Sequence, residues 1–288
     1  MRSASRKAAP TAKLGIIAGG GNLPGRLLDA CQARGCDTFV LAYRGVGEVE
    51  SVTPDAWVDI GRVGDTFAAL HSAGCDEVVL AGPIQRPKLS ALKLDKRGRA
   101  ILGKLVRVWG RDDALLSLVV DELEGQGFRV VGADDVLRDL LAAEGPLGRL
   151  TPNEQAKEDI ELGVQVITAL GTLDIAQAVV VQAGRVLGIE AAEGTDLLID
   201  RCGELKADDQ VKPILVKLQK PGQERRVDMP AVGATTVTRA AAAGFAGIAI
   251  ESGGTLVMDR EALIEHADKL GLFVIAIAPI RTSDTRIS

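Results

Sequence analysis

A glycine-rich turn near the start of the chain has the composition of a phosphate-binding loop. It consists of Gly19, Gly20, Gly21, Asn22, Leu23 and Pro24. Glycine lets the backbone approach an anion closely, and the first N–H groups of the helix that follows point at the anion. Pro24 stands where the third glycine of a dinucleotide fingerprint would stand, and no Gly-Lys-Ser/Thr follows. We therefore expect phosphate contact without a nicotinamide or Walker-type site; the alternative is a tight turn that binds nothing.

A second loop follows the apolar run at residues 77–81, at the edge where α/β sheets bind ligands. Gly82 gives this loop a turn, and Arg86 could contact a phosphate. The alternative is a surface loop with a solvated cation.

A third turn, residues 190–196, has three carboxylates and a hydroxyl group within seven residues: it contains Glu190, Glu193, Gly194, Thr195 and Asp196. Hard cations such as Mg²⁺ prefer oxygen ligands, so this turn is a plausible metal or substrate site. The alternative is a helix N-cap at Thr195 or Asp196.

The most unusual stretch, residues 217–236, combines cations, acids and amides with proline and glycine. The residues in it that we expect to contact substrate are Lys217, Gln223, Arg225, Arg226, Thr235 and Thr236. Asp228 is the acid that we expect to hold Mg²⁺ or to orient a water. Pyrophosphate hydrolysis needs such groups, because cations neutralise phosphates while a carboxylate holds the metal or the water. Thr235 or Thr236 is expected to cap the next helix, and the alternative for the whole stretch is a solvated connector.

Composition argues against several other functions. The 288 residues contain only two histidines, and the four cysteines form no CxxC pair, which disfavours zinc sites and catalytic triads. A net charge of −5 and an aromatic fraction of 3% disfavour nucleic acid as a partner. The first twelve residues lack the apolar stretch of a signal peptide, and no apolar run is long enough to span a bilayer, so we expect a cytoplasmic protein.

The first half of the chain alternates short apolar strands with helical segments, which predicts a Rossmann-like parallel sheet in an α/β fold. A long helix is expected over residues 89–109. Two glycines and two prolines in residues 145–152 predict a linker. We therefore place the domains at residues 13–147 and 150–288.

The second half mixes a hairpin with crossover connections. Ala183 and Gly184 join apolar runs at residues 178–182 and 185–190, a pattern typical of a tight β-hairpin. Helices are expected near residues 154–170, 236–243 and 260–270, and strands near 211–219, 246–250 and 273–278. This pattern predicts a mixed sheet and thus a C-terminal α+β domain.

Five stretches together resemble one family. They are IIAGGGNLPG, AGPIQRPKL, GRDDALL, VLGIEAAEGTDLLI and VKLQKPGQERRVDMPAVGATTV, in this order from about Leu14 to Ala278. With their EGTD and DMPxxG elements, they resemble the UDP-2,3-diacylglucosamine pyrophosphatases of the LpxI type, from lipid A biosynthesis.

The resemblance implies hydrolysis of UDP-2,3-diacylglucosamine to UMP and 2,3-diacylglucosamine 1-phosphate (lipid X), with Mg²⁺ or Mn²⁺ and attack by water. It implies that Asp228 is catalytic, and we take Asp228, Asp196 and Glu193 as the expected metal ligands. The family often has Asp where Glu224 stands, which argues against a metal role for Glu224. An acylated substrate implies transient contact with the inner-membrane surface, and a homodimer is the default expectation.

Two other functions are compatible with the same residues. A sugar-nucleotide or nucleotidyl transferase would use the same phosphate turn and Mg²⁺ with an acceptor other than water. A nucleotide-sensing module would bind without turnover, and its acids would only cap helices.

Overall fold

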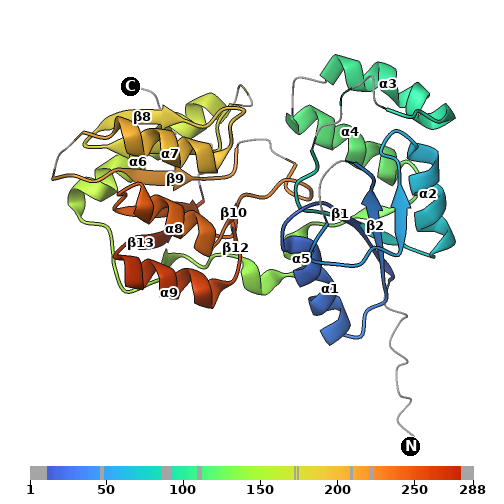
Figure 1. Ribbon diagram of the computed structural model, residues 1–288, viewed down its shortest axis with the longest axis horizontal. Coiled ribbons are helices and arrows are strands. Elements are labelled where there is room, and N and C mark those ends of the chain that lie inside the picture. Colours follow the sequence, from blue (N-terminus) through green and yellow to red (C-terminus); the bar gives the residue numbers. More distant parts are fainter. Residues whose placement is uncertain are drawn as a thin grey trace, which may run out of the picture. The chain divides into compact units, whose positions relative to one another are not determined.

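The computed structural model describes residues 12–45, 49–85, 88, 92–108, 112–171, 173, 175–207, 210–220 and 224–279. The chain divides into two compact units, which are drawn in Figure 1. The first unit comprises Met1–Leu137 with Glu224–Val227, and the second comprises Arg138–Gln223 with Asp228–Ser288.

The first unit contains a parallel sheet of five strands in the order β3-β2-β1-β4-β5. The strands are β1 (Leu14–Ala18), β2 (Thr38–Tyr43), β3 (Ala56–Val58), β4 (Glu77–Ala81) and β5 (Arg129–Val130). Each strand pairs in parallel with its neighbours. The parallel sheet expected from the apolar runs is therefore confirmed. The strand order reverses between β1 and β4, because β2 and β3 lie on one side of β1 and β4 and β5 lie on the other. Such a switch point places a crevice at the carboxyl ends of β1 and β4.

Helices of the first unit pack on this sheet through aliphatic side chains. They are α1 (Leu23–Ala33), α2 (Val63–Ser72), α3 (Lys96–Val108), α4 (Asp112–Glu124) and α5 (Ala133–Val136). One core cluster joins Ile17 and Leu41 of the sheet to Phe67 and Leu70 of α2 and Leu123 of α4. Burial of these apolar surfaces is the main force that holds the helices to the sheet.

The helix predicted over residues 89–109 was placed too early in the chain at its N-terminal end. Residues 92–95 are not helical, and α3 begins at Lys96. Asp95 explains this boundary, because its Oδ1 accepts a hydrogen bond of 2.6 Å from the backbone N–H of Gly98. A carboxylate that accepts such a bond caps a helix start. The short helix α5 was not expected either.

The second unit contains a mixed sheet of six strands in the order β6-β13-β11-β9-β7-β8. The strands are β6 (Gly145–Pro146), β7 (Ala178–Gln182), β8 (Arg185–Ile189), β9 (Ile214–Lys217), β11 (Gly247–Glu251) and β13 (Phe273–Ile277). β7 runs antiparallel to both its neighbours, whereas β9, β11 and β13 are parallel. The mixed sheet expected for this half is therefore confirmed.

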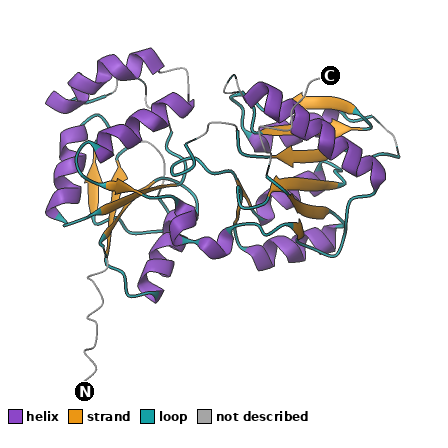
Figure 2. Ribbon diagram, turned by 180° about the vertical axis from the view of Figure 1, so that it is seen from behind, coloured by secondary structure: helices purple, strands orange, loops and turns teal. Residues whose placement is uncertain are grey.

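Figure 2 shows helices on both sides of this second sheet. They are α6 (Glu154–Gly171), α7 (Thr195–Leu205), α8 (Ala234–Ala242) and α9 (Arg260–Leu270), and a small separate pair is formed by β10 (Ala231–Val232) and β12 (Leu256–Val257). One face carries Ala178 and Leu215 and packs on α7, α8 and α9. The other face carries Val179 and Val216 and packs on α6. The alternation follows from the two-residue period of a strand.

The expected hairpin at residues 178–190 is confirmed, and a buried carboxylate holds its turn. Ala183 and Gly184 have φ angles of 51° and 73°. Asp159 of α6 is completely buried and accepts hydrogen bonds from the backbone N–H groups of both, at 2.9 and 2.6 Å. Positive φ at both central residues is the geometry of a two-residue hairpin turn.

Part of the expected linker is a strand instead. Gly145 and Pro146 form β6, which pairs antiparallel with β13 at the edge of the second sheet. Proline is compatible with an edge strand, because its missing N–H can face away from the sheet. Glycine and proline in this segment therefore form an edge strand of the sheet as well as a turn.

Candidate functional site

The first two loops singled out in the sequence lie together at the carboxyl edge of the first sheet. The backbone N–H of Gly19 donates to the carbonyl of Ala81 at 2.7 Å, and that of Gly20 donates to the carbonyl of Pro83 at 2.9 Å. A Cβ atom on Gly19 would lie 2.5 Å from the Pro83 oxygen. Close packing of the two loops thus accounts for Gly19 without any ligand, and phosphate contact by this turn stays a prediction.

The turn after Gly20 leads into α1. Gly21 has a φ of 75°, Asn22 occupies the N-cap position, and Leu23 and Pro24 open the helix. The Ser51 hydroxyl accepts a hydrogen bond from the Gly25 N–H at 3.3 Å and donates to the Gly21 carbonyl at 2.8 Å. Sequence reasoning missed Ser51, which lies in a polar segment without a motif. Two other predicted contacts, Arg86 and Gln223, lie outside the described residues.

The carboxyl edge of the second sheet gathers more of the predicted residues. β8 runs parallel to β9 because each is antiparallel to β7, so their carboxyl ends lie at the same edge. Thr195 begins α7 shortly after β8, and Lys217 is the last residue of β9. Ala231 of β10, which precedes α8, accepts a hydrogen bond of 3.1 Å from Lys217 Nζ. This edge therefore combines a lysine with the N-terminus of α7, and helix N-termini favour anions.

Lys217 is the best buried of the predicted cations. Its residue is only 7% exposed. Burial lowers the pKa of its ammonium group, while the negative charges of Glu190, Asp196 and Asp228 oppose that shift. Three carboxylates from two segments of the chain are therefore close enough to act on one lysine electrostatically. Such a buried cation, with a perturbed pKa, is a feature of functional sites.

Glu190 has the largest electrostatic effect on Lys217 among these three acids, and it is 6% exposed. Its Oε1 accepts a hydrogen bond of 2.9 Å from the Thr195 hydroxyl. Burial raises the pKa of its carboxyl group, against the opposing charge of Lys217. Sequence reasoning included Glu190 in the oxygen-rich turn but chose only Glu193 and Asp196 from it as metal ligands; the signal that favours Glu190 is an acid placed directly after an apolar strand.

Two of the expected metal ligands, Glu193 and Asp196, have cationic partners. Glu193 Oε1 accepts a hydrogen bond of 2.7 Å from Arg201, which lowers the pKa of the Glu193 carboxyl group. Asp196 lies 3.7 Å from Arg239. A metal role for Glu193 would compete with Arg201 and stays a prediction. The helix here begins at Thr195 after Gly194, so neither Thr195 nor Asp196 is the N-cap.

Arg225 and Arg226 belong to the first unit. Arg225 Nε lies 3.2 Å from Asp134, and Arg226 pairs with Glu124 at 2.6 Å and with Glu224 at 2.8 Å. The two carboxylates beside Arg226 raise the pKa of its guanidinium group. In this arrangement the two arginines anchor the chain segment, and phosphate contact by them stays a prediction.

Thr235 and Thr236 lie in the first turn of α8. The helix begins at Ala234, and Gly233 occupies the N-cap position in an extended conformation. The expectation that one of the two threonines caps α8 was therefore wrong, because the glycine turn ends earlier than the hydroxyl pattern suggested. Both threonines stay candidates for substrate contact.

The residues can be tested for a fit to a divalent cation. Among the described residues, no three His, Cys, Asp or Glu side chains gather where they could hold a metal ion. Mg²⁺ usually binds through one or two carboxylates together with substrate phosphates and waters. Asp196 and Asp228 both act on the charge of Lys217, and their oxygen donors are of the type that this mode of binding uses; a metal held by these two residues stays a prediction.

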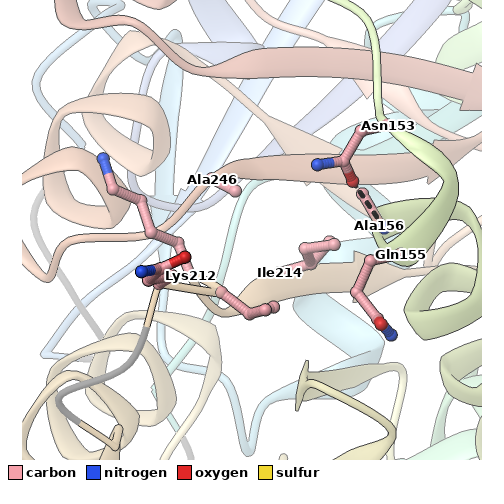
Figure 3. A pocket seen from close by; sticks show the side chains of 8 residues that line it. Asn153, Gln155, Ala156, Lys212, Ile214 and Ala246 are labelled. Atoms are coloured by element: carbon pink, nitrogen blue, oxygen red, sulfur yellow. Dashed lines mark hydrogen bonds between the residues drawn. The ribbon is translucent and has the colours of Figure 1, made fainter.

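A shallow pocket at the opposite edge of the second sheet contains none of the predicted residues. Figure 3 shows Asn153 beside the start of α6, with Ile214 and Ala246 near the beginnings of β9 and β11. Asn153 Oδ1 accepts a hydrogen bond of 2.8 Å from the Ala156 N–H and caps α6. The Asn153 side chain thus has a structural role, and we place the candidate site at the carboxyl edge of the second sheet.

Comparisons with known proteins cover nearly the whole chain. The family model described as LpxI N-terminal domain matches residues 13–140, and the one described as LpxI C-terminal domain matches residues 143–275. A relative from Caulobacter vibrioides, named UDP-2,3-diacylglucosamine pyrophosphatase LpxI, is 43% identical over 275 residues, which are 93% of this chain and 98% of that protein.

A solved structure gives a much weaker likeness. It is N5-carboxyaminoimidazole synthase from Aspergillus clavatus, 15% identical, over 70% of this chain and 46% of that one, with a TM-score of 0.20. A TM-score this low supports no conclusion. The two family models and the identity to the Caulobacter protein show that the chain belongs to the LpxI family.

Proposed function

We propose that this chain hydrolyses the pyrophosphate bond of UDP-2,3-diacylglucosamine and releases UMP and 2,3-diacylglucosamine 1-phosphate. The observation that carries the proposal is the 43% identity, over 93% of the chain, to a relative named for this pyrophosphatase. The carboxyl edge of the second sheet supports it, because a buried lysine, two acids and a helix N-terminus suit a substrate with two phosphates.

In this proposal Lys217 supplies a fixed positive charge to the phosphates. Its ammonium group is held by the Ala231 carbonyl, so little reorganisation is needed when a phosphate binds. A preorganised charge in a site that excludes water stabilises a transition state more than the same charge in solvent. The N–H groups at the start of α7 add to this field.

Asp228 is the proposed catalytic carboxylate, which would hold Mg²⁺ or Mn²⁺ together with Asp196 or orient the attacking water. A bound divalent cation would neutralise phosphate charge and activate a water. Asp228 follows directly in sequence after the segment Glu224–Val227, which belongs to the first unit.

The acyl chains of the proposed substrate imply that the protein contacts a membrane surface. No helix in the described parts of the chain has the length and apolar character needed to cross a bilayer. We propose transient contact with the cytoplasmic face of the inner membrane and, as a separate expectation, a homodimer.

The deciding experiment measures UMP release from UDP-2,3-diacylglucosamine by the purified protein, with Mg²⁺ or with EDTA. We expect release that needs the metal and that falls by about 10²-fold or more in Asp228→Ala, the scale of losing a transition-state electrostatic group. Glu265→Ala, an exposed acid on α9, is the matched control and should keep the full rate.

Other outcomes would point to the other functions. Transfer of the nucleotide or sugar phosphate to an added acceptor, with no free UMP, would indicate a transferase. Metal-dependent stabilisation by UMP without any turnover would indicate a nucleotide-sensing module. An Asp228→Ala variant with near-normal turnover would remove Asp228 from the proposed mechanism.

A further inference from the structure

Three residues form one row across the second sheet at the edge of the candidate site. Ala178 pairs directly with Lys217 across β7 and β9. On the other side, Val179 pairs with Ile189, and the next step of this antiparallel register places Ala178 opposite Glu190. The Glu190 N–H donates to the Ala178 carbonyl at 2.9 Å, in agreement with that register.

Residues that lie directly opposite one another in a sheet present their side chains on the same face. Glu190 and Lys217 are therefore two strands apart, about 10 Å at the backbone, with only the Ala178 methyl group between them. Each side chain is long enough to lean over this small residue. Both are more than nine-tenths buried, and each acts on the charge of the other.

The two oxygens of Glu190 differ in their partners. Oε1 accepts the hydrogen bond from Thr195, whereas Oε2 is buried and has no hydrogen-bond partner among the described residues. A buried acid with an unsatisfied oxygen costs free energy that an exposed residue would not cost. The row continues from Glu190 through Ala178 and Lys217 to Ile250, so an acid at this position has Lys217 as its charged neighbour in the row.

The bond to Thr195 fixes the direction of its hydroxyl group. An ionised carboxylate only accepts hydrogen bonds, so the shared hydrogen must come from Thr195. Thr195 Oγ1 then has only its lone pairs left, and it can accept a hydrogen bond but not donate one. Thr195 is also the first residue of α7, where the backbone N–H groups supply the donors for an anion.

We propose that Glu190 is a positioning residue of this site: it holds the Thr195 hydroxyl group as an acceptor for a substrate hydroxyl or a water, and it keeps a negative charge beside Lys217. The inference deepens the proposed function and rests on it for the identity of the ligand. Phosphates would meet Lys217 and the α7 N–H groups, while Thr195 would orient a hydrogen-bond donor.

Charged groups from several segments of the chain act on Glu190 and Lys217. Glu193 and Lys220 act on Glu190 in addition to Lys217. Asp196 and Asp228 act on Lys217 in addition to Glu190. Of these, Glu190 has the largest effect in keeping Lys217 charged against the cost of burial. Removal of the Glu190 charge should therefore lower the pKa of Lys217 further.

The test is a double-mutant cycle in the full chain, with UMP release as the assay. Glu190→Ala and Thr195→Val should each reduce kcat by about 10–100-fold, as is typical for residues that orient a ligating group, with little change in KM. The double variant should lose no more than the worse single variant, because the two residues act as a unit. Glu204→Ala, an exposed acid on the same helix, is the matched control.

The conservative variant Glu190→Gln separates positioning from simple support of the fold. It keeps an acceptor for Thr195, so it should recover most of the kcat lost in Glu190→Ala. Because it removes the charge, the alkaline limb of its pH–rate profile should move to lower pH. A residue that only supports packing would change the amount of folded enzyme and leave that limb in place.

A second measurement does not depend on turnover. In protein labelled at lysine Cε with ¹³C, the Lys217 resonance, assigned with Lys217→Met, should titrate at a lower pH in Glu190→Gln than in the unmodified chain. If the unmodified chain releases no UMP, the proposed function fails, and this titration still decides whether the two side chains are coupled. Additive losses in the cycle, or equal Lys217 titrations, would overturn the inference.

Discussion

Replacing Asp159 with alanine should loosen the β7–β8 hairpin and lower the stability of the second unit. The Asp159 carboxylate accepts hydrogen bonds from the N–H groups of Ala183 and Gly184 at 2.9 and 2.6 Å. Hydrogen bonds to a charged group contribute about 1.5–3 kcal/mol each. Ala183 and Gly184 are exposed, so water can replace part of what is lost. We therefore expect a loss of about 2–4 kcal/mol in the free energy of unfolding, below the sum of the two bonds.

Urea unfolding followed by circular dichroism measures the global loss, and hydrogen exchange at the amides of Ala183 and Gly184 measures the local one. Glu158→Ala is the matched control, since Glu158 is exposed on the same helix; it should change stability by less than about 0.5 kcal/mol. A loss of that small size in Asp159→Ala would refute the reasoning. It would mean that the backbone preferences of the two turn residues hold the hairpin without the carboxylate.

Three further predictions use other parts of the chain. Gly82→Ala should destabilise the first unit by about 2 kcal/mol or more in urea, because Gly82 has a φ of 85° and an added Cβ would overlap the Gly20 carbonyl; Gly103→Ala, in open space on α3, should be neutral or stabilising. Burial raises the pKa of the Glu190 carboxyl group above its ordinary 4.5. The stability that this shift contributes is fully present below pH 4.5 and is lost as the pH rises through the raised pKa of the folded protein. Unfolding measured from pH 4 upward should accordingly show Glu190→Gln gaining stability relative to the unmodified chain, and a constant difference would contradict the shift. Removal of divalent cations with EDTA should stop UMP release without changing the circular dichroism spectrum, whereas loss of structure would assign the metal a folding role.

The sequence was most informative where one local rule decides the structure. Apolar runs between glycines located most strands of both sheets, although not β6. The Ala183-Gly184 pair located the hairpin, because few other residue pairs suit two positive φ angles. Helix starts were less predictable. Gly194 and Gly233 set two of them, next to hydroxyl or acidic residues that looked equally suitable as caps. Asp95 set a third, inside a segment predicted to be helical from residue 89.

The candidate site was predictable in its residue types and much less so in its partners. Lys217 and Thr195 were chosen from motifs and lie at the same sheet edge. Their link through Glu190 depends on strand register, and register joins residues that are far apart in sequence. In the same way, the pairing of Arg226 with Glu124 depends on a segment that folds with the other half of the chain.

That segment, Glu224–Val227, has a consequence for how the protein is made. Val227 packs with the core cluster of the first unit, although most of the second unit's sequence precedes it. During synthesis, the first unit therefore stays incomplete until the ribosome has passed Val227. A fragment that ends at Leu137 would lack those contacts permanently. We expect such a fragment to be less stable than the same unit in the full chain, and addition of a peptide with the sequence of residues 224–227 to be too weak a substitute for the covalent connection.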